Sequence, residues 1–438
     1  MMARLLNRKL IRTIMANSNA ETEVFVYADW EMYDSPRLIG ILYYSSVRGK
    51  DTYSFEYDAT WLKEGIEIDP ELPLFSGRLY SASSNNFGVF QDSAPDRWGM
   101  KLIKRREALL AKAGKRSLKR IVAIDFLLGI YDRHRMGGLR YKIDKDGEFV
   151  CEDKSLAAPP WTSLRELEHA VEQYEKNADK LDEETLKWIN QLFAPGSSLG
   201  GARPKADVTD ENQYPWIAKF PSKNDTTDIG LWEMIVHDLA IKAGITVPQA
   251  QVKQFKSKYH TYLSKRFDRT ETGKRIHYSS AMTLLNRSDG DDASEGSSYL
   301  DIVELIKSIS FRPIEDLEEL FRRVMFSVCV SNTDDHLRNH GFLYTENGWM
   351  LSPAFDINPN EDGIGLKLNI NEDDNSLDMD LVMLTADYYL ISEKRAEEIK
   401  NEVVNAVKLW RSVAKKYHAS ESEIALKSLA FNIINNHT

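Results

Sequence analysis

The sequence predicts an α+β protein of two or three packed units, with β-rich segments near its N-terminus and a mainly helical C-terminal part. A chain of 438 residues with 42% hydrophobic and 10% aromatic content can bury a substantial core. Residues 22–57 are rich in β-branched, aromatic and aliphatic side chains between polar turns, which is typical of strands. Residues 313–330 instead carry apolar side chains at the spacing of one buried helix face.

The composition excludes several classes of protein. No window approaches the run of about 18 apolar residues that a spanning helix needs, so we expect no membrane partner. A net charge of -10 does not suit a nucleic-acid footprint over the whole surface, and DNA contact is expected only locally or through a partner. Because the chain has only Cys151 and Cys329, we expect no disulfide framework and a reducing, cytoplasmic compartment.

The N-terminal part predicts a basic tail followed by a β-rich subdomain over residues 21–150. Residues 1–20 are basic and lack the apolar stretch of a secretory signal, so we expect a disordered tail. Helical signals follow the strands at residues 98–113 and 118–130.

A β-hairpin is expected next. Residues 139–143 and 148–151 flank Asp146 and Gly147, a dipeptide that favours a tight turn.

Linking helices and separate strands are expected over residues 151–270. Ser163 and Glu166 match a capping box, and another helix is predicted from Asp182 to Phe193. A strand over 214–220 precedes a helix that opens at Asp228. Within the mainly helical remainder, 271–438, we expect residues 287–298 to be disordered because they are polar, acidic and glycine-containing.

A polar cluster ends the apolar helix of residues 313–330. It runs from Ser331 to Asn339, and such a cluster is costly to bury without partners. Residues 342–344 and 349–351 then predict a hairpin whose second strand leads back to Asp356. The sequence therefore predicts that three side chains with functional oxygens, those of Asp334, Asn339 and Asp356, meet.

The spacing within this cluster points to phosphoryl transfer. Asp334 and Asn339 are separated by four residues, as in the catalytic loop of protein kinases, where the Asp takes the hydroxyl proton and the Asn holds Mg²⁺. Asn339 and Asp356 supply the hard oxygens that suit Mg²⁺. The alternative interpretation is structural, with the cluster capping the helix and Asp334 paired to Arg338 on the surface.

A nucleotide also needs a phosphate cradle and a positioned cation. Residues 196–205, Gly-Ser-Ser-Leu-Gly-Gly-Ala-Arg-Pro-Lys, offer flexible backbone amides and two cations, although a plain turn explains them as well. Lys219 on the strand and Glu233 on the helix match the kinase arrangement that orients the α and β phosphates, and Glu233 could equally face solvent. The strand that runs into Lys265–Arg269 could bind adenine through its backbone.

Together these residues resemble the HipA family of bacterial toxin-type serine/threonine kinases. The resemblance implies a two-lobed protein-kinase-like fold with a β-rich N-terminal subdomain and an all-α C-terminal lobe, and an ATP- and Mg²⁺-dependent activity. Residues 151–270 would then be the part that resembles a kinase N-lobe, and residues 271–438 the mainly helical kinase C-lobe. It rests on these segments: Ala94–Gly99, Ser198–Lys205, Trp216–Phe220, Ala243–Pro248, Arg266–Arg269, Thr333–Asn339 and Ser352–Ile357.

The resemblance also implies roles for single residues. Asp334 would be the catalytic base, and Asn339 and Asp356 the metal ligands. Ser198 would be the autophosphorylated serine that silences the kinase, with Ser197 as the alternative. Nucleotide contacts are implied for Gly200, Gly201, Ala202, Arg203, Pro204, Lys205, Lys219, Lys265, Arg266, Phe267, His336, Arg338 and Phe355.

The partners implied are a protein substrate, a small helix-turn-helix antitoxin, and DNA only through that antitoxin. Family members act on translation components such as aminoacyl-tRNA synthetases, but no residue here selects a target. The sequence departs from better-known members at Arg203 and Pro204, where they carry a polar and an acidic residue. Two alternatives stay open: a small-molecule or lipid kinase on a kinase-like fold, and a non-catalytic nucleotide-binding corepressor module.

Overall fold

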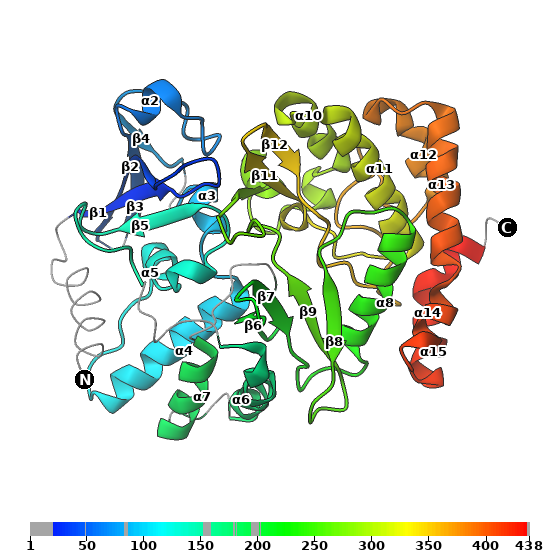
Figure 1. The fold of residues 1–438 in the computed structure, drawn as a ribbon, viewed down its shortest axis with the longest axis horizontal. Helices are drawn as coiled ribbons and strands as arrows, with labels where there is room; N and C mark the ends of the chain where they lie inside the picture. The colour runs from blue at the N-terminus through cyan, green and yellow to red at the C-terminus, as the bar shows by residue number, and fades with distance from the viewer. Residues whose placement is uncertain are drawn as a thin grey trace. The chain divides into compact units, whose positions relative to one another are not determined.

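The computed structural model describes residues 21–48, 50–82, 86–151, 159–177, 180, 182–193, 201 and 203–435. The predicted basic tail, residues 1–20, lies outside them. The chain forms two compact units, each assembled from separate stretches of sequence (Figure 1). Unit 1 comprises Met1–Pro159, Asn177–Ala202 and Asp268–His277, and unit 2 comprises Pro160–Lys176, Arg203–Phe267 and Tyr278–Thr438.

Unit 1 is built on an antiparallel sheet with strand order β4-β3-β2-β1-β5. Its inward side chains, among them Val24, Leu42 and Phe55, are fully buried, as the alternating pattern predicts. The predicted helix of residues 98–113 is confirmed as α4, which Asp96 caps by accepting a hydrogen bond from the Gly99 amide at 2.8 Å. The elements are β1 (Thr22–Ala28), β2 (Arg37–Val47), β3 (Lys50–Tyr57), α2 (Trp61–Glu64), β4 (Arg78–Tyr80), α3 (Gly88–Asp92), α4 (Arg97–Ala113), α5 (Ala123–Leu128), η1 (Asp132–His134), β5 (Leu139–Lys142) and α7 (Glu183–Phe193).

The predicted hairpin after residue 139 is wrong in its pairing. β5 forms, but its ladder partner is β1, with Phe25 opposite Lys142. The chain does turn at Asp144–Gly147, and the Val150 amide donates a hydrogen bond to Tyr141 at 2.8 Å, yet residues 148–151 form no strand. The edge of β5 is thus used by a distant strand, which a local turn signal does not reveal.

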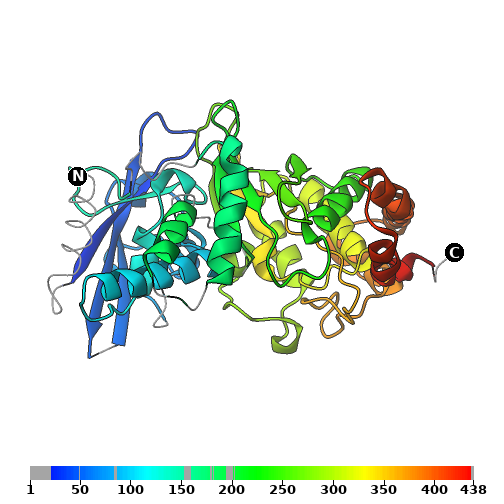
Figure 2. The same cartoon turned by 90° about the horizontal axis from the view of Figure 1, so that it is seen from below.

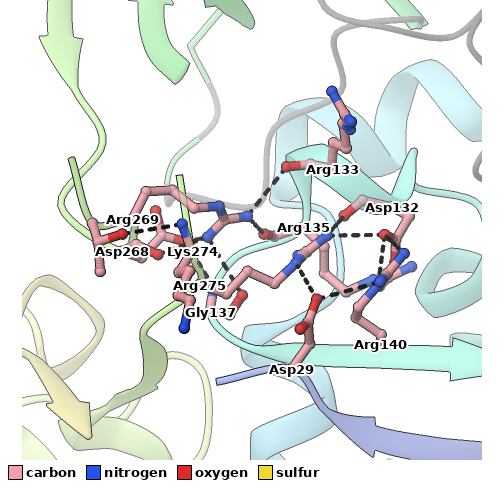
Figure 3. Close-up of polar contacts among 11 residues, drawn as sticks. Asp29, Asp132, Arg133, Arg135, Gly137, Arg140, Asp268, Arg269, Lys274 and Arg275 are labelled. Carbon is pink, nitrogen blue, oxygen red and sulfur yellow. Dashed lines mark hydrogen bonds and ion pairs between the residues drawn. The ribbon is translucent and has the colours of Figure 1, made fainter. Parts of the chain in front are cut away.

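A buried charge cluster fastens the segment Asp268–His277 into unit 1 (Figure 3). Asp132 accepts hydrogen bonds from Arg140 and Arg275, both at 2.9 Å, and Asp29 lies at the edge of the same cluster. Arg275, Arg140 and Arg135 hold the pKa of Asp132 below its ordinary value although burial alone would raise it.

The same segment is also held by its backbone neighbours. Asp268 accepts a hydrogen bond from the Gly137 amide at 2.8 Å, and Arg269 donates to the carbonyls of Arg133 and Arg135 at 3.1 and 2.9 Å. A segment late in the sequence therefore completes the early unit.

Unit 2 contains two sheets and most of the helices. The four-stranded sheet has the order β6-β7-β9-β8 and is followed along the chain by a three-stranded sheet, β10-β11-β12. The predicted hairpin of residues 342–351 is confirmed as β11 and β12, with Phe342 opposite Leu351. The first elements are η3 (Trp161–Ser163), α6 (Leu164–Lys176), β6 (Lys205–Thr209), β7 (Pro215–Lys219), α8 (Ile229–Lys242), β8 (Ala250–Lys253), β9 (Thr261–Lys265) and β10 (His277–Ser280).

The helical part of unit 2 is centred on α11, whose apolar face is completely buried. The helices α13 and α14 pack on α11 and α8. Figure 1 labels them in orange and red next to α8, and Figure 2 shows the same colours near the C-terminus. The elements are α9 (Ala281–Leu284), η4 (Ala293–Glu295), α10 (Tyr299–Ile309), α11 (Pro313–Cys329), η5 (Leu337–Asn339), β11 (Gly341–Thr345), β12 (Gly348–Leu351), α12 (Met379–Leu384), η6 (Ala386–Tyr389), α13 (Glu393–Val407), α14 (Trp410–Lys416), α15 (Glu421–Lys427) and η7 (Ser428–Asn435).

The expected disorder at residues 287–298 is wrong. Asp292 forms a capping box with Glu295 at the start of η4, and Ser298 forms one with Asp301 at the start of α10. The polar residues that suggested disorder are therefore the caps of two short elements. Within the part of the chain that the structure describes, no helix is both long and apolar enough to cross a bilayer.

Candidate active site

Two loops of unit 2, residues 331–339 and 352–360, lie side by side, and together they are called the floor of the candidate site. The first follows α11 and begins at Ser331, whose φ of 51° turns the chain sharply. The second follows β12. The Asn358 amide donates to Asn332 Oδ1 at 3.1 Å, the Asn360 amide donates to the Ser331 carbonyl at 3.1 Å, and Asn360 Nδ2 donates to Thr333 Oγ1 at 2.7 Å. The two polar segments that the sequence singled out are thus brought together.

Asp334 and Asn339 are held at fixed positions in the first loop. Asn339 Nδ2 and the His336 amide both donate to the Asp334 carbonyl, each at 3.0 Å. The Asp334 carboxylate itself is exposed and so can meet a substrate. Asn339 is buried, and its Oδ1 has no hydrogen-bond partner among the described residues.

Asp335 holds the first loop in place through its buried carboxylate. Its carboxylate accepts hydrogen bonds from Tyr299 at 2.8 Å and Ser327 at 3.2 Å, and it pairs with His340 at 3.1 Å. Burial raises the pKa of Asp335, but His340 and the two hydroxyl donors outweigh burial and keep this pKa below its ordinary value. The hydrogen bonds from Tyr299 on α10 and Ser327 on α11 therefore tie the loop to both helices.

Lys219 lies between two carboxylates. It is the last residue of β7, and its Nζ pairs with Glu233 Oε1 at 2.6 Å and with Asp356 Oδ1 at 2.5 Å. Glu233 is buried on α8, so it does not face solvent. Burial lowers the pKa of Lys219, but the charges of Asp356 and Glu233 outweigh burial and raise it. Lys219 therefore stays protonated, and it holds the pKa of Asp356 well below its usual range.

A second lysine adds positive charge near Asp356. Lys205 is buried on β6 directly opposite Lys219 in the β6–β7 ladder, and its charge also lowers the pKa of Asp356. Asp356 has a φ of 60°, a backbone conformation that non-glycine residues rarely adopt and that is often found at functional sites.

The end of the predicted phosphate cradle is fastened by an ion pair. Arg203 donates two hydrogen bonds to Asp225, both at 2.7 Å, which is the bidentate geometry of a strong arginine–carboxylate pair. The Pro204 carbonyl accepts a hydrogen bond from the Phe220 amide at 2.8 Å, and Gly201 has a φ of 95° that suits glycine. Ser197, Ser198, Gly200 and Ala202 lie outside the described residues.

The predicted adenine segment is placed at the end of β9. Its Lys265 and Arg266 amides donate to the carbonyls of Gln249 and Pro215, at 2.8 and 3.0 Å, and so are already used within the protein. The Arg266 guanidinium is buried against Asp207, so this side chain supports the sheet. The Phe267 ring packs in a tilted arrangement against that of Phe355, which precedes Asp356, with 5.4 Å between the ring centroids. This aromatic pair joins the predicted adenine segment to the predicted metal loop.

His336 and Arg338 occupy the rim of the first loop. His336 lies near enough to Asp356 to lower the pKa of that carboxyl group. Arg338 reaches Asp289 at 3.4 Å. Both side chains are half-buried, which leaves part of each accessible to a ligand.

The donor set fits a magnesium ion that is shared with a nucleotide. Within the described ranges no three His, Cys, Asp or Glu side chains form a metal cluster. Asn339 Oδ1 and the Asp356 carboxylate supply hard oxygens, and Mg²⁺ commonly takes one or two such groups and completes its shell with phosphates and water. The unpartnered, buried Oδ1 of Asn339 is the observation that favours a ligand here.

Comparisons with known proteins place this fold. The family model of the HipA N-terminal domain matches residues 31–125, and that of the HipA-like C-terminal domain matches residues 197–410. This chain belongs to the HipA family. A solved HipA, in a complex described as the Shewanella oneidensis MR-1 toxin antitoxin system HipA, HipB and its operator DNA, superposes with a TM-score of 0.67 at 16% identity. The match covers 94% of this chain and 97% of that HipA chain, and it confirms the predicted two-lobed HipA-like fold.

Two curated relatives match shorter stretches. The "Putative kinase" of Haemophilus influenzae is 27% identical over 180 residues, which is 37% of this chain and 52% of that protein. The "Putative kinase Y4mE" of Sinorhizobium fredii is 28% identical over 149 residues, 33% of this chain and 34% of that protein. The chain thus matches about half and about a third of the lengths of these relatives.

Several residues of this HipA-family site were not foreseen from the sequence. Asp225 was missed because its pairing with Arg203 joins residues on either side of β6 and β7. Asp335 was given no role in the predicted site, although its hydrogen bonds from Tyr299 and Ser327 hold the loop that carries Asp334 and His336. Asn358 follows Asp356 by two residues, and a polar side chain so close to a predicted metal ligand was the signal that could have identified it.

Proposed function

We propose that this chain is an ATP- and Mg²⁺-dependent serine/threonine protein kinase and the toxin of a HipA/HipB-type toxin–antitoxin pair. The observation that carries the proposal is the ion-paired cluster of Lys219, Glu233 and Asp356 on the same floor as Asp334 and Asn339. These are the groups that phosphoryl transfer needs: a fixed cation for the phosphates, hard oxygens for Mg²⁺, and a carboxylate for the attacking hydroxyl.

Each residue then has a defined task. A serine or threonine oxygen of the substrate attacks the γ-phosphorus, and its proton passes to Asp334. The new oxygen–phosphorus bond forms as the bond to the oxygen that bridges the β and γ phosphates breaks, and ADP leaves. Lys219 orients the α and β phosphates, and Glu233 keeps Lys219 in place. Mg²⁺, when held by Asn339 and Asp356, neutralises the phosphate charge.

The remaining predicted residues surround the nucleotide in this proposal. Residues 200–205 cradle the phosphates, with the Arg203–Asp225 pair fixing the end of that loop. The Phe267–Phe355 pair contacts the adenine, together with the backbone groups of 265–267 other than the Lys265 and Arg266 amides. His336 and Arg338 lie at the rim. Phosphorylation of Ser198, or of Ser197, would place up to two negative charges beside the site and inactivate it.

The proposed partners follow from the family. The solved HipA relative is complexed with HipB and operator DNA, which supports a small antitoxin partner and indirect DNA contact for this chain. The substrate is proposed to be a protein, for which a translation component such as an aminoacyl-tRNA synthetase is the candidate.

Transfer of label from γ-labelled ATP tests the proposal. We expect label on the chain itself, lost in Ser198→Ala, and a decrease of about 10²- to 10⁴-fold in Asp334→Ala. Asp373→Ala, which removes an exposed carboxylate from a turn that supplies no predicted site residue, should leave the rate unchanged. An unchanged rate in Asp334→Ala would refute the assignment of the base, and ATP consumption without labelled protein would favour a small-molecule or lipid kinase.

A further inference from the structure

Two buried amide oxygens without partners lie on the floor of the candidate site. Among the described residues, Asn339 and Asn358 are the amide side chains whose oxygen is both buried and without a hydrogen-bond partner. Leaving one such acceptor unsatisfied costs about 1–3 kcal/mol. They lie on adjoining loops, one of which carries Asp356, the carboxylate that pairs with Lys219 together with Glu233, and two such oxygens call for a ligand.

The orientation of the Asn358 amide is fixed by its neighbour. Asn358 Nδ2 donates to Asp356 Oδ1 at 3.3 Å. The reverse orientation would place the amide oxygen against the carboxylate, where two acceptors repel, and would leave the NH₂ group without that acceptor. The Asn358 backbone amide is tied to Asn332, so the loop cannot easily turn the side chain away. Oδ1 is therefore the atom of Asn358 that is left for a ligand.

The two carboxylate oxygens of Asp356 likewise differ in their hydrogen-bond partners. Lys219 and Asn358 both donate to its Oδ1. Its Oδ2 receives no hydrogen bond from the described part of the chain. Asn339 Oδ1, Asn358 Oδ1 and Asp356 Oδ2 are thus three hard oxygens without protein donors on two loops that are hydrogen-bonded to each other.

We propose that Asn358 is a third protein ligand of the divalent cation, through Oδ1, and that it also holds Asp356 through Nδ2. The inference rests on the proposed function, which places a cation at Asn339 and Asp356. Two neutral amide oxygens and one carboxylate suit Mg²⁺ or Mn²⁺, whose remaining positions go to phosphate oxygens and water.

Direct metal binding by the 438-residue chain tests this role without measuring catalysis. Mn²⁺ is titrated in the presence of a non-hydrolysable ATP analogue, and free Mn²⁺ is followed by electron paramagnetic resonance. Asn358→Ala should weaken Mn²⁺ binding by about tenfold or more. Asn401→Ala is the matched control, because Asn401 is an exposed amide whose side-chain hydrogen bonds stay within α13. It should bind Mn²⁺ like the unaltered chain, and thermal unfolding of each variant verifies that it is folded.

A thiolate at the same position distinguishes a ligand from a mere support of Asp356. Asn358→Cys with Cd²⁺ and the nucleotide analogue should show a thiolate-to-metal charge-transfer absorption, since thiolates prefer soft metals. The unaltered chain, with Cys151 and Cys329, should not show it. Normal Mn²⁺ binding by Asn358→Ala together with no new absorption overturns the ligand role alone. Failure of the unaltered chain to bind Mn²⁺ with the nucleotide, or undiminished binding by Asp356→Asn, overturns the proposed metal site itself.

Discussion

At the scale of single residues, Lys219 is a buried cation shared by two carboxylates. Lys219→Met leaves Glu233 and Asp356 close together with no positive charge between them, and we expect it to destabilise the fold by about 3–5 kcal/mol. Adding Glu233→Gln removes one of the two negative charges, so the double variant should be more stable than Lys219→Met. Urea denaturation of the two variants measures this difference, and a double variant less stable than the single one would contradict the arrangement.

His277 predicts how stability depends on pH. It is buried and stacks on Trp30 at 4.7 Å, and burial lowers its pKa from 6.5 to about 3. Below pH 6.5 the unfolded chain binds a proton at His277 and the folded chain does not. The stabilisation that comes from keeping His277 neutral is therefore fully present above pH 6.5. As the pH falls from 6.5 toward the pKa of His277 in the folded chain, the free energy of unfolding decreases by about 1.4 kcal/mol per pH unit.

The variant His277→Phe isolates this effect, because phenylalanine can stack on Trp30 but cannot titrate. Asp69 acts in the opposite direction, since burial raises its pKa from 3.8 to about 6 and the folded chain binds that proton first. Asp69 is present in both proteins, so it cancels in the difference. Chemical denaturation at about pH 7.5 and about pH 5 should show the unaltered chain losing more stability than His277→Phe. Equal losses would mean that His277 is protonated in the folded chain.

Single residues also show what the sequence could and could not predict. Lys219 and Glu233 were expected as a pair because each sits at a recognisable place on a strand and a helix, and the structure joins them. The roles of Asn358 and Asp225 were not predicted, because their partners are brought near them only by the packing of separate loops. The catalytic, metal-binding and nucleotide-binding roles stay predictions that the proposed experiments test.

At the scale of elements, α8 carries Glu233, and its N-terminus is held by Asp228. This carboxylate caps the helix through the Leu231 amide at 3.2 Å and also binds the amide and ring of His260, at 2.9 and 2.6 Å. Asp228→Ala should cost about 2 kcal/mol, the upper end for a cap, because it breaks the link to His260 as well.

Asp378 provides the control for this prediction. It caps α12 through the Asp380 amide at 2.8 Å but is exposed, so Asp378→Ala should cost about 1 kcal/mol. The two free energies of unfolding are compared by urea denaturation. If Asp378→Ala lowered the free energy of unfolding more than Asp228→Ala does, the bonds between Asp228 and His260 would contribute nothing to stability.

Elements were predictable where the signal is local. The 3.6-residue apolar period of α11, with Pro313 at its first position, and the turn at Glu346–Asn347 between β11 and β12 both depend on neighbours in sequence. Residues 148–151 were mistaken for a strand because β5 pairs instead with β1, more than a hundred residues earlier. A turn dipeptide depends only on residues close in sequence, so it does not indicate a strand partner that lies so far away.

At the scale of the whole molecule, the chain passes between the two units after residues 159, 176, 202, 267 and 277. The expected domain boundaries near residues 150 and 270 stay predictions. A linear division of the sequence does not describe units built from interleaved segments, because composition along a chain cannot reveal that Asp268–His277 belongs with residues that precede it by more than a hundred positions.

This interleaving makes Asp132 a residue on which the stability of the whole chain depends. Asp132→Asn leaves the buried Arg275 and the half-buried Arg140 without the nearer of the two carboxylates that they share, and we expect the free energy of unfolding to fall by about 3–5 kcal/mol. Asp29→Asn is the matched control. Asp29 is partly exposed and makes longer pairs with the same arginines, at 3.3 and 3.5 Å, so its loss should cost about 1 kcal/mol or less.

Calorimetry and hydrogen exchange together test how far the effect of Asp132 reaches. Because each unit contains segments that are enclosed in sequence by the other, we expect one cooperative unfolding transition, which Asp132→Asn shifts to lower temperature without splitting. Amides of residues 268–277 should lose protection in Asp132→Asn and keep it in Asp29→Asn, since the segment is fastened through Arg275 to Asp132. An early, separate transition in Asp132→Asn would instead show that unit 1 unfolds on its own and that interleaving does not couple the units.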